Sequence, residues 1–139
     1  MDCDYKLKQV LSIKSKIINI TNIKEGECVG YNRSFVAKKD MVVATIPLGY
    51  ADGIFRSFSK RGKVLCCGKF CKVIGNICMD MFMIDITKTE AKLFDEVVLI
   101  GSDNFGNKID IDTFASWCNT ISYEILTSIK QDRFDVIIT

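Results

Sequence analysis

Residues 77–86 read ICMDMFMIDI, and this stretch gives the clearest indication of the fold class. Successive side chains of a β-strand point to opposite faces of a sheet, so each residue can be assigned to one face. One face would carry Cys78, Asp80, Phe82, Ile84 and Ile86, and the other would carry Ile77, Met79, Met81, Met83 and Asp85. The stretch therefore predicts a β-strand over nearly its whole length.

Short segments of similar character lie on both sides of this stretch, separated by turn residues. They cover residues 9–20, 27–37, 41–47, 63–67, 69–74, 95–101 and 120–129. Gly68 is the expected turn of a hairpin, and Pro47 is expected to end a strand.

Helix signals are fewer. Residues 112–118 (DTFASWC) predict one short helix, with Asp110 or Asp112 as its N-cap. The pair Asp52-Gly53 predicts a turn or the start of another short helix. Many short strands with one or two short helices predict a mainly β fold, in the form of a compact, strand-rich, barrel-like domain or a sandwich.

The chain has 139 residues, which is the size of one domain, and a chain of this size can bury its own core. Its composition, 48% hydrophobic and 26% charged, is typical of a globular protein rather than a disordered one. Histidine is absent, which excludes Ser-His-Asp and Cys-His catalysis within these residues. Any chemistry must therefore use Tyr, Cys, Lys, Arg or carboxylates, or be completed by another polypeptide.

The net charge of +2 is too small to indicate nucleic-acid binding by itself. Seven cysteines occur without a C-x-x-C pair, and Cys66, Cys67 and Cys71 lack histidine partners for a zinc site. We therefore expect no metal, and reduced cysteines in a cytoplasmic protein. No apolar run has the length of a membrane helix, so no membrane partner is expected.

Tyr31 is the first residue that could carry chemistry. In an extended segment, Tyr31 and Arg33 would point to the same side. A phenol acts as a base near neutral pH only if positive charge lowers its pKa from about 10. From spacing alone, a half-buried strand tyrosine is the favoured interpretation.

Two further stretches combine constrained and polar residues. In GYADG at 49–53, glycines flank Tyr50 and Asp52, which indicates a backbone shape that glycine permits. Asp80 would lie among apolar neighbours, so it needs a hydrogen bond or a charged partner. Asp80 is therefore either a structural anchor or a site residue, whereas Met79 alone predicts core or interface packing.

Four stretches, taken together, resemble one family in their order and spacing. They are GYNRSF at 30–35, ATIPLGYADG at 44–53, GNICMDMFMID at 75–85 and NTISYEILTSI at 119–129. They look like the C-terminal domain of bacterial alanine racemase, and the resemblance runs from about Leu7 to Ile129. GYADG and ICMD are its most specific parts.

The resemblance implies a pyridoxal-phosphate enzyme that interconverts L- and D-alanine by a two-base mechanism. It places the cofactor lysine on an N-terminal β/α barrel, and the active site at the interface of a homodimer. Each C-terminal domain would lend residues to the barrel of the other subunit. Tyr31 would be the catalytic tyrosine, and Met79 would bind substrate through its backbone N–H. The residues implied to support or line the entry of the site are Tyr50, Asp80, Tyr123, Arg56 and Ile121.

The sequence departs from the family pattern at three places. Asn32 stands where most members have glycine, and Asn76 stands where an arginine often lines the substrate corridor. The run Lys130–Asp135 (KQDRFD) replaces the usual Arg-Val-Pro-Arg, which leaves the docking of this segment open.

Because the barrel is not among these 139 residues, we interpret residues 1–139 as a single domain. The chain would be a fragment or split product of a racemase, or the product of a naturally truncated gene. On its own it is predicted to have no racemase activity and no bound cofactor.

Three alternatives remain open from the sequence. The same kind of domain serves serine and broad-specificity racemases. The chain could instead be a non-catalytic module that binds RNA or protein through Gly62–Lys72, where Lys63, Lys69 and Lys72 surround Phe70. It could also be a regulatory remnant that pairs with an intact racemase.

Overall fold

Eight strands form one curled antiparallel sheet in the computed structural model, which describes residues 8–139 apart from the side chain of Tyr31. Cys3 and Leu7 lie outside the described residues. The strands are β1 (Ile13–Lys16), β2 (Asn19–Ile23), β5 (Met41–Ile46), β6 (Lys63–Cys66), β7 (Lys69–Ile74), β8 (Phe82–Asp85), β9 (Glu96–Ser102) and β10 (Lys108–Ile109). Their order is β1-β9-β6-β7-β8-β5-β2, and β10 pairs with β9.

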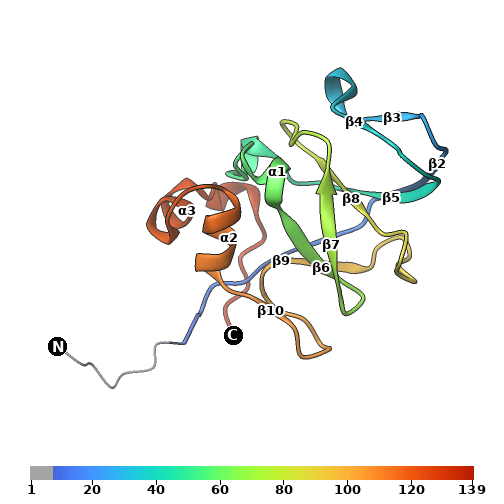
Figure 1. Cartoon of the computed structure of the whole chain (residues 1–139). Helices are drawn as coiled ribbons and strands as arrows, with labels where there is room; N and C mark the ends of the chain where they lie inside the picture. Colours follow the sequence, from blue (N-terminus) through green and yellow to red (C-terminus); the bar gives the residue numbers. More distant parts are fainter. Residues whose placement is uncertain (1–7) are drawn as a thin grey trace.

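A separate two-stranded ribbon and several short helices complete the described part of the chain. The ribbon pairs β3 (Cys28–Val29) with β4 (Phe35–Val36). The α-helices are α1 (Phe58–Arg61), α2 (Ile111–Trp117) and α3 (Ser122–Ser128), and the 3-10 turns are η1 (Tyr31–Arg33), η2 (Tyr50–Asp52) and η3 (Gln131–Arg133). Figure 1 shows the three α-helices gathered on one side of the sheet, with the β3–β4 ribbon at the opposite end.

The main core lies between the sheet and these helices. The ring of Phe58 packs edge-on against Phe82, with 6.1 Å between centroids, and lies 4.7 Å from the ring of Phe114. All three are at most 1% exposed. Burying an aromatic side chain stabilises a fold by roughly 2–3 kcal/mol, so this cluster holds α1 and α2 on the sheet. A smaller cluster underlies the ribbon and contains Ile23, Val29, Ala37, Met41, Val43 and Ile74.

The predicted fold class is confirmed: the domain is mainly β, strand-rich and curled like part of a barrel. The hairpin of β6 and β7 is also confirmed, and its turn uses both Cys67 and Gly68, which have positive φ angles of 51° and 77°. Asp110 is the N-cap of α2, since its carboxylate accepts a hydrogen bond from the Thr113 N–H at 2.7 Å. This bond lowers the pKa of Asp110. In residues 8–139, no helix combines the length and apolar character needed to cross a membrane.

The prediction of one strand over residues 77–86 is wrong for the first half. β8 begins only at Phe82, because the Cys78 N–H donates to the Met81 carbonyl at 2.9 Å and forms a turn. As a result, Asp80 does not lie on the buried face of a strand, and its side chain is 53% exposed.

The β character predicted for residues 120–129 is also wrong, because α3 spans Ser122–Ser128. Ile125 is buried in the main core, and α3 packs against α2. The hydroxyl groups of Thr127 and Ser128 donate to carbonyls of their own helix, at Tyr123 and Ile125. Tertiary packing thus outweighs the strand propensity of isoleucine and threonine.

Two predicted strands are each divided in the structure. Residues 9–20 are split, since β1 pairs with β9 whereas β2 pairs with β5. Residues 27–37 are interrupted by η1 between β3 and β4. Tyr31 and Arg33 are therefore not in an extended segment, contrary to the expectation above.

Candidate functional site

The loop between β7 and β8, residues 75–81, is the junction of the candidate site. The turn at 49–53 docks on it through the backbone: the Tyr50 N–H donates to the Cys78 carbonyl at 3.1 Å, and the Ala51 N–H donates to the Met79 carbonyl at 3.0 Å. These two bonds bring the GYADG and ICMD motifs into direct contact.

Gly49 is required by this close approach rather than by its φ angle. A Cβ atom built at Gly49 would lie 2.2 Å from the Cys78 carbonyl oxygen and 2.3 Å from that of Met79. Gly53, at the other end of the turn, has a φ of 103°, and its Cβ would lie 2.3 Å from the Ser128 carbonyl oxygen. Only glycine lets the turn fit between the loop and the end of α3.

Asp52 holds the turn from within. It is 5% exposed, and one carboxylate oxygen accepts a hydrogen bond from the Gly49 N–H at 2.8 Å. The other accepts from Arg133 Nε at 2.7 Å, and the Asp52 carbonyl accepts from the Lys130 N–H at 3.1 Å. The buried carboxylate is thus both hydrogen-bonded and paired with a cation, as burial requires.

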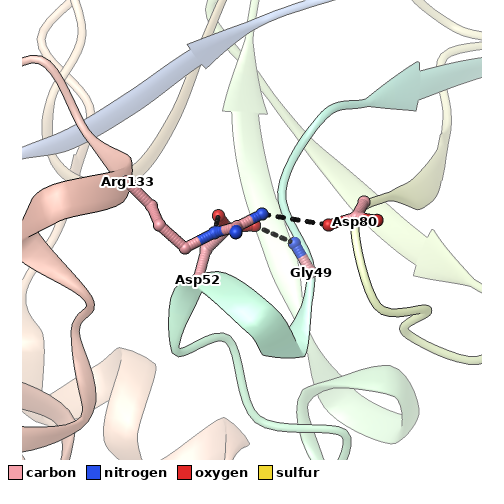
Figure 2. Close-up of polar contacts among 4 residues, drawn as sticks. All are labelled: Gly49, Asp52, Asp80 and Arg133. Carbon is pink, nitrogen blue, oxygen red and sulfur yellow. Dashed lines mark hydrogen bonds and ion pairs between the residues drawn. The ribbon is translucent and has the colours of Figure 1, made fainter.

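Arg133 joins Asp52 to the junction loop. Its Nη2 donates to the Asp80 carboxylate at 3.0 Å while its Nε contacts Asp52 (Figure 2). The Asp52 carboxylate raises the pKa of the Arg133 guanidinium, so the charge is retained. We call the set Gly49, Asp52, Asp80 and Arg133 the clasp. Asp80 thus has the charged partner that was expected for it, and its supporting role in the site stays a prediction.

The clasp shows how the C-terminal segment contacts the rest of the domain. The KQDRFD run lacks the family's Arg-Val-Pro-Arg, but it docks on the site through Arg133 and Lys130. The role of Arg133 was missed because nothing near it in the sequence indicates a partner. The only signal was indirect: a buried Asp52 needs a cation, and the sequence does not say which one.

The turn that carries Tyr31 also reaches the junction loop. Gly30, Asn32 and Arg33 have φ angles of 84°, 58° and 53°, which turn the chain sharply. Asn32 has a left-handed backbone, and asparagine tolerates this conformation better than most residues. This is the position where the family usually has glycine, so the departure is structurally conservative.

Ser34 links that turn to the junction, because its hydroxyl oxygen accepts a hydrogen bond from the Asn76 N–H at 3.0 Å. The backbone around Tyr31 therefore lies near the loop that carries Met79. The side chain of Tyr31 is outside the described part of the structure, and its predicted role stays a prediction.

A third contact fixes the loop to α1. The Ser59 hydroxyl oxygen accepts a hydrogen bond from the Ile77 N–H at 2.8 Å, two residues before Met79. Arg56 and Asn76, both predicted to lie near a substrate corridor, line the same surface hollow of about 530 Å³. Like Ser34, Ser59 was not identified from the sequence, because a hydroxyl that accepts from a distant backbone N–H leaves no local pattern.

The predicted site residues that are described have exposed side chains. Tyr50 is 47% exposed and Met79 is 54% exposed, and they flank the same backbone contact. The Met79 N–H donates to no described residue, although its carbonyl is engaged. Tyr123 and Ile121, at 75% and 64% exposure, lie at the start of α3, and no hydrogen bond within residues 8–139 joins their side chains to Tyr50 or Met79.

Two cysteines of the β6–β7 hairpin, Cys66 and Cys67, have raised pKa values and so remain thiols, whereas a hydrogen bond with Cys66 lowers the pKa of Cys71. Burial raises the pKa of Cys67 to about 12, with a further contribution from Asp95, and burial raises that of Cys118 to about 12. A hydrogen bond with Cys71 raises the pKa of Cys66. Residues 8–139 contain no group of three or more His, Cys, Asp or Glu side chains arranged to hold a metal ion.

The sequence matches the family model described as "Alanine racemase, C-terminal domain" over residues 10–137. The chain belongs to the alanine racemase family. It is 41% identical over 128 residues to the alanine racemase of Clostridium novyi, which covers 91% of this chain and 33% of that protein. It is 41% identical over 119 residues to the alanine racemase of Thermodesulfovibrio yellowstonii, covering 85% of this chain and 32% of that protein.

Solved racemase structures have the same fold. The alanine racemase of Bacillus anthracis, solved with bound L-Ala-P, superposes with a TM-score of 0.85 at 34% identity over 91% of this chain and 32% of its own. That of E. faecalis gives 0.86 at 32% identity over 94% of this chain and 34% of its own. The chain thus corresponds to the C-terminal domain of alanine racemase and spans about one third of the length of these relatives.

Proposed function

We propose that this domain supplies one wall of an alanine racemase active site and does not form a site alone. The observation that carries the proposal is the Met79 N–H. The loop around it is fixed by Tyr50, Ala51, Ser59 and Ser34, yet this N–H has no described acceptor, and Met79 as a residue is 54% exposed. A rigidly held, free donor is suited to orient a substrate carboxylate or phenolate.

Racemisation needs a base on each face of the α-carbon, since a proton leaves from one side and another returns to the opposite side. We assign the base on one face to the Tyr31 hydroxyl and the base on the other face to a lysine of the barrel. Arg33 and Asn32 set the backbone turn on which Tyr31 lies. Met79 would hold the substrate in place between the two bases.

The family's cofactor, pyridoxal phosphate, supplies when bound an electron sink for the α-carbon. The residues of this domain fit one side of such a group: they offer a free N–H at Met79 and the exposed phenols of Tyr50 and Tyr123. We place the lysine that attaches the cofactor on the barrel, outside these 139 residues. The domain alone is therefore proposed to bind no cofactor.

The proposed partners are the barrel of the same enzyme and that of a second subunit, in a homodimer. Large apolar side chains are exposed on the loop, turn and helix that carry the site, namely Tyr50, Met79, Met81, Ile121, Tyr123 and Leu126. Exposed apolar groups of this kind are suited to an interface with a barrel. The proposed substrate is alanine, with serine or a broader set as the variant, and the proposed location is the cytoplasm.

A chimera tests this function. The chain would replace the matching C-terminal third of the Clostridium novyi racemase, to which it is 41% identical. We expect the chimera to interconvert L- and D-alanine, and Tyr31→Phe to lower kcat by at least about 100-fold, the usual contribution of a positioned base. Tyr50→Phe, which also removes one phenolic hydroxyl, should lower kcat by less than about tenfold because Tyr50 is assigned no proton transfer.

The controls separate the parts of the proposal. Lys72→Gln changes an exposed residue of β7 remote from the clasp and should leave kcat unchanged. The 139-residue chain alone should show no turnover. A Tyr31→Phe chimera with full activity would overturn the assignment of the base, and a folded but inactive parent chimera would overturn the proposed function.

A further inference from the structure

The surface hollow next to the junction loop is rich in hydrogen-bond donors. It has a volume of about 530 Å³ and lies between α1, the end of α2 and the loop. Its lining includes Arg56, Lys60, Arg61, Asn76, Trp117 and Asn119. A volume of this size is within the range of small-molecule sites.

The positive charges in the hollow are not neutralised by the rest of the described chain. Arg56, Lys60 and Arg61 form no ion pair within 4.0 Å of a described carboxylate, whereas Lys14, Lys24 and Arg133 do. Arg61 makes one hydrogen bond, from Nη1 to the Ser116 carbonyl at 3.3 Å. No Asp or Glu is among the lining residues.

The neutral lining groups add further donors. The indole N–H of Trp117 has no acceptor among residues 8–139, and Asn76 and Asn119 line the same hollow. Trp117 is half-buried and packs partly on the main core, which holds its ring in place. The lining therefore includes three cationic residues, a tryptophan and two asparagines, with no acidic residue, and an anion is the ligand that such a set favours.

The elements around the hollow are held in position. Ser57 Oγ donates to the Cys118 carbonyl at 2.6 Å, and this bond connects the start of α1 to the end of α2. Ser59 of α1 accepts from the Ile77 N–H of the loop. Figure 1 shows α1 and α2 as neighbours on the same side of the sheet. The donors are thus presented on a frame and not on a free loop.

We propose that this hollow is a binding site for a compact oxyanion, a phosphate or carboxylate group, with Lys60 and Arg61 as its main cationic ligands and Trp117 at its wall. Arg56 and Asn76 have been considered above for substrate entry, whereas Lys60, Arg61, Trp117 and Asn119 have no role in the proposed function. The site does not depend on racemase activity, so it can be tested on the 139-residue chain alone.

Trp117 makes the test specific, because it is the single tryptophan of the chain. Its fluorescence would be followed during titration with inorganic phosphate and, separately, with sodium acetate. Sodium chloride at matched ionic strength controls for general salt effects. Saturation by phosphate alone would assign the phosphate class, saturation by both would assign the broader oxyanion class, and either result supports the site.

Variants then locate the ligands. The double variant Lys60→Gln/Arg61→Gln should raise the half-saturating phosphate concentration by at least about tenfold, since it removes two charge-assisted contacts. Lys72→Gln, an exposed lysine outside the hollow, removes one positive charge and should leave it unchanged. Circular dichroism would verify that each variant is folded. No saturation by either oxyanion, an equal response to chloride, or an unchanged double variant would overturn the proposal.

Discussion

The turn at Gly49–Gly53 and the turn at Gly30–Ser34 both begin with a glycine, carry a tyrosine and meet the loop at 75–81. They are held very differently. The first is fixed by two backbone bonds to the loop and by the clasp around buried Asp52. The second is tied to the loop by the Ser34 hydroxyl and to the domain by a ribbon of two residue pairs.

The difference indicates how the two tyrosines are positioned. The backbone of Tyr50 is fixed by this domain alone, through groups that are buried or paired. The backbone of Tyr31 has fewer anchors, so we expect its final position to depend on contact with a barrel. Three predictions compare the two turns, from the largest expected effect to the smallest.

The largest effect is expected from Gly49→Ala. Its Cβ would overlap backbone carbonyl atoms, which cannot rotate away, so the free energy of unfolding should fall by about 3 kcal/mol in urea titrations. A Cβ at Gly30 would meet mainly the Ser34 hydroxyl, a side-chain atom and not backbone, but the φ of Gly30 is 84°, so Gly30→Ala should cost about 2 kcal/mol. Gly26→Ala, with a φ of 88° and no atom nearby, is the control and should cost about 1 kcal/mol. An equal loss at positions 49 and 26 would contradict the importance of close approach.

An intermediate effect is expected within the clasp. Asp52→Ala leaves the Gly49 N–H without its acceptor in a buried place and should lower the free energy of unfolding by about 2 kcal/mol. Asp80→Ala removes the other carboxylate bound by Arg133, but that side chain is 53% exposed, so the loss should stay below about 0.5 kcal/mol. Chemical denaturation of both variants checks this order, and a larger loss for Asp80→Ala would show that the clasp is held from the loop side.

The smallest effect is expected in the Tyr31 turn, at Asn32. A β-branched residue disfavours the left-handed backbone found there, so Asn32→Val should cost about 1 kcal/mol. Asn32→Gly restores the usual family residue and should change stability by less than about 0.5 kcal/mol. Thermal unfolding of the two variants would measure the difference. A stable valine variant would imply that the turn adopts another backbone conformation.

The sequence predicts well the parts of the fold that depend on neighbouring residues. The β6–β7 hairpin follows from Gly68, and the start of α2 follows from the Asp110 cap. The resemblance also identified the motifs that meet at the junction loop. These features need only a few consecutive residues to be recognised.

The errors concern residues that distant contacts control. The run 77–81 alternates like a strand, but it forms a loop because the Gly49–Gly53 turn binds its carbonyls. The segment 120–129 is rich in β-branched residues, but burial of Ile125 against α2 makes it helical. Arg133 finds its carboxylate 81 residues away, and no local pattern predicts such a partner. The roles of Tyr31, Met79 and the other site residues stay predictions.

The clasp also has a consequence for the order of events during synthesis. Asp52 and Arg133 are 81 residues apart, so at typical rates of translation Arg133 emerges about 4 to 16 seconds after Asp52. Throughout that interval the carboxylate has the Gly49 N–H as a local partner but lacks its cation. The GYADG turn can therefore form early on the ribosome. It gains its ion pair with Arg133 only when one of the last segments of this domain has been made.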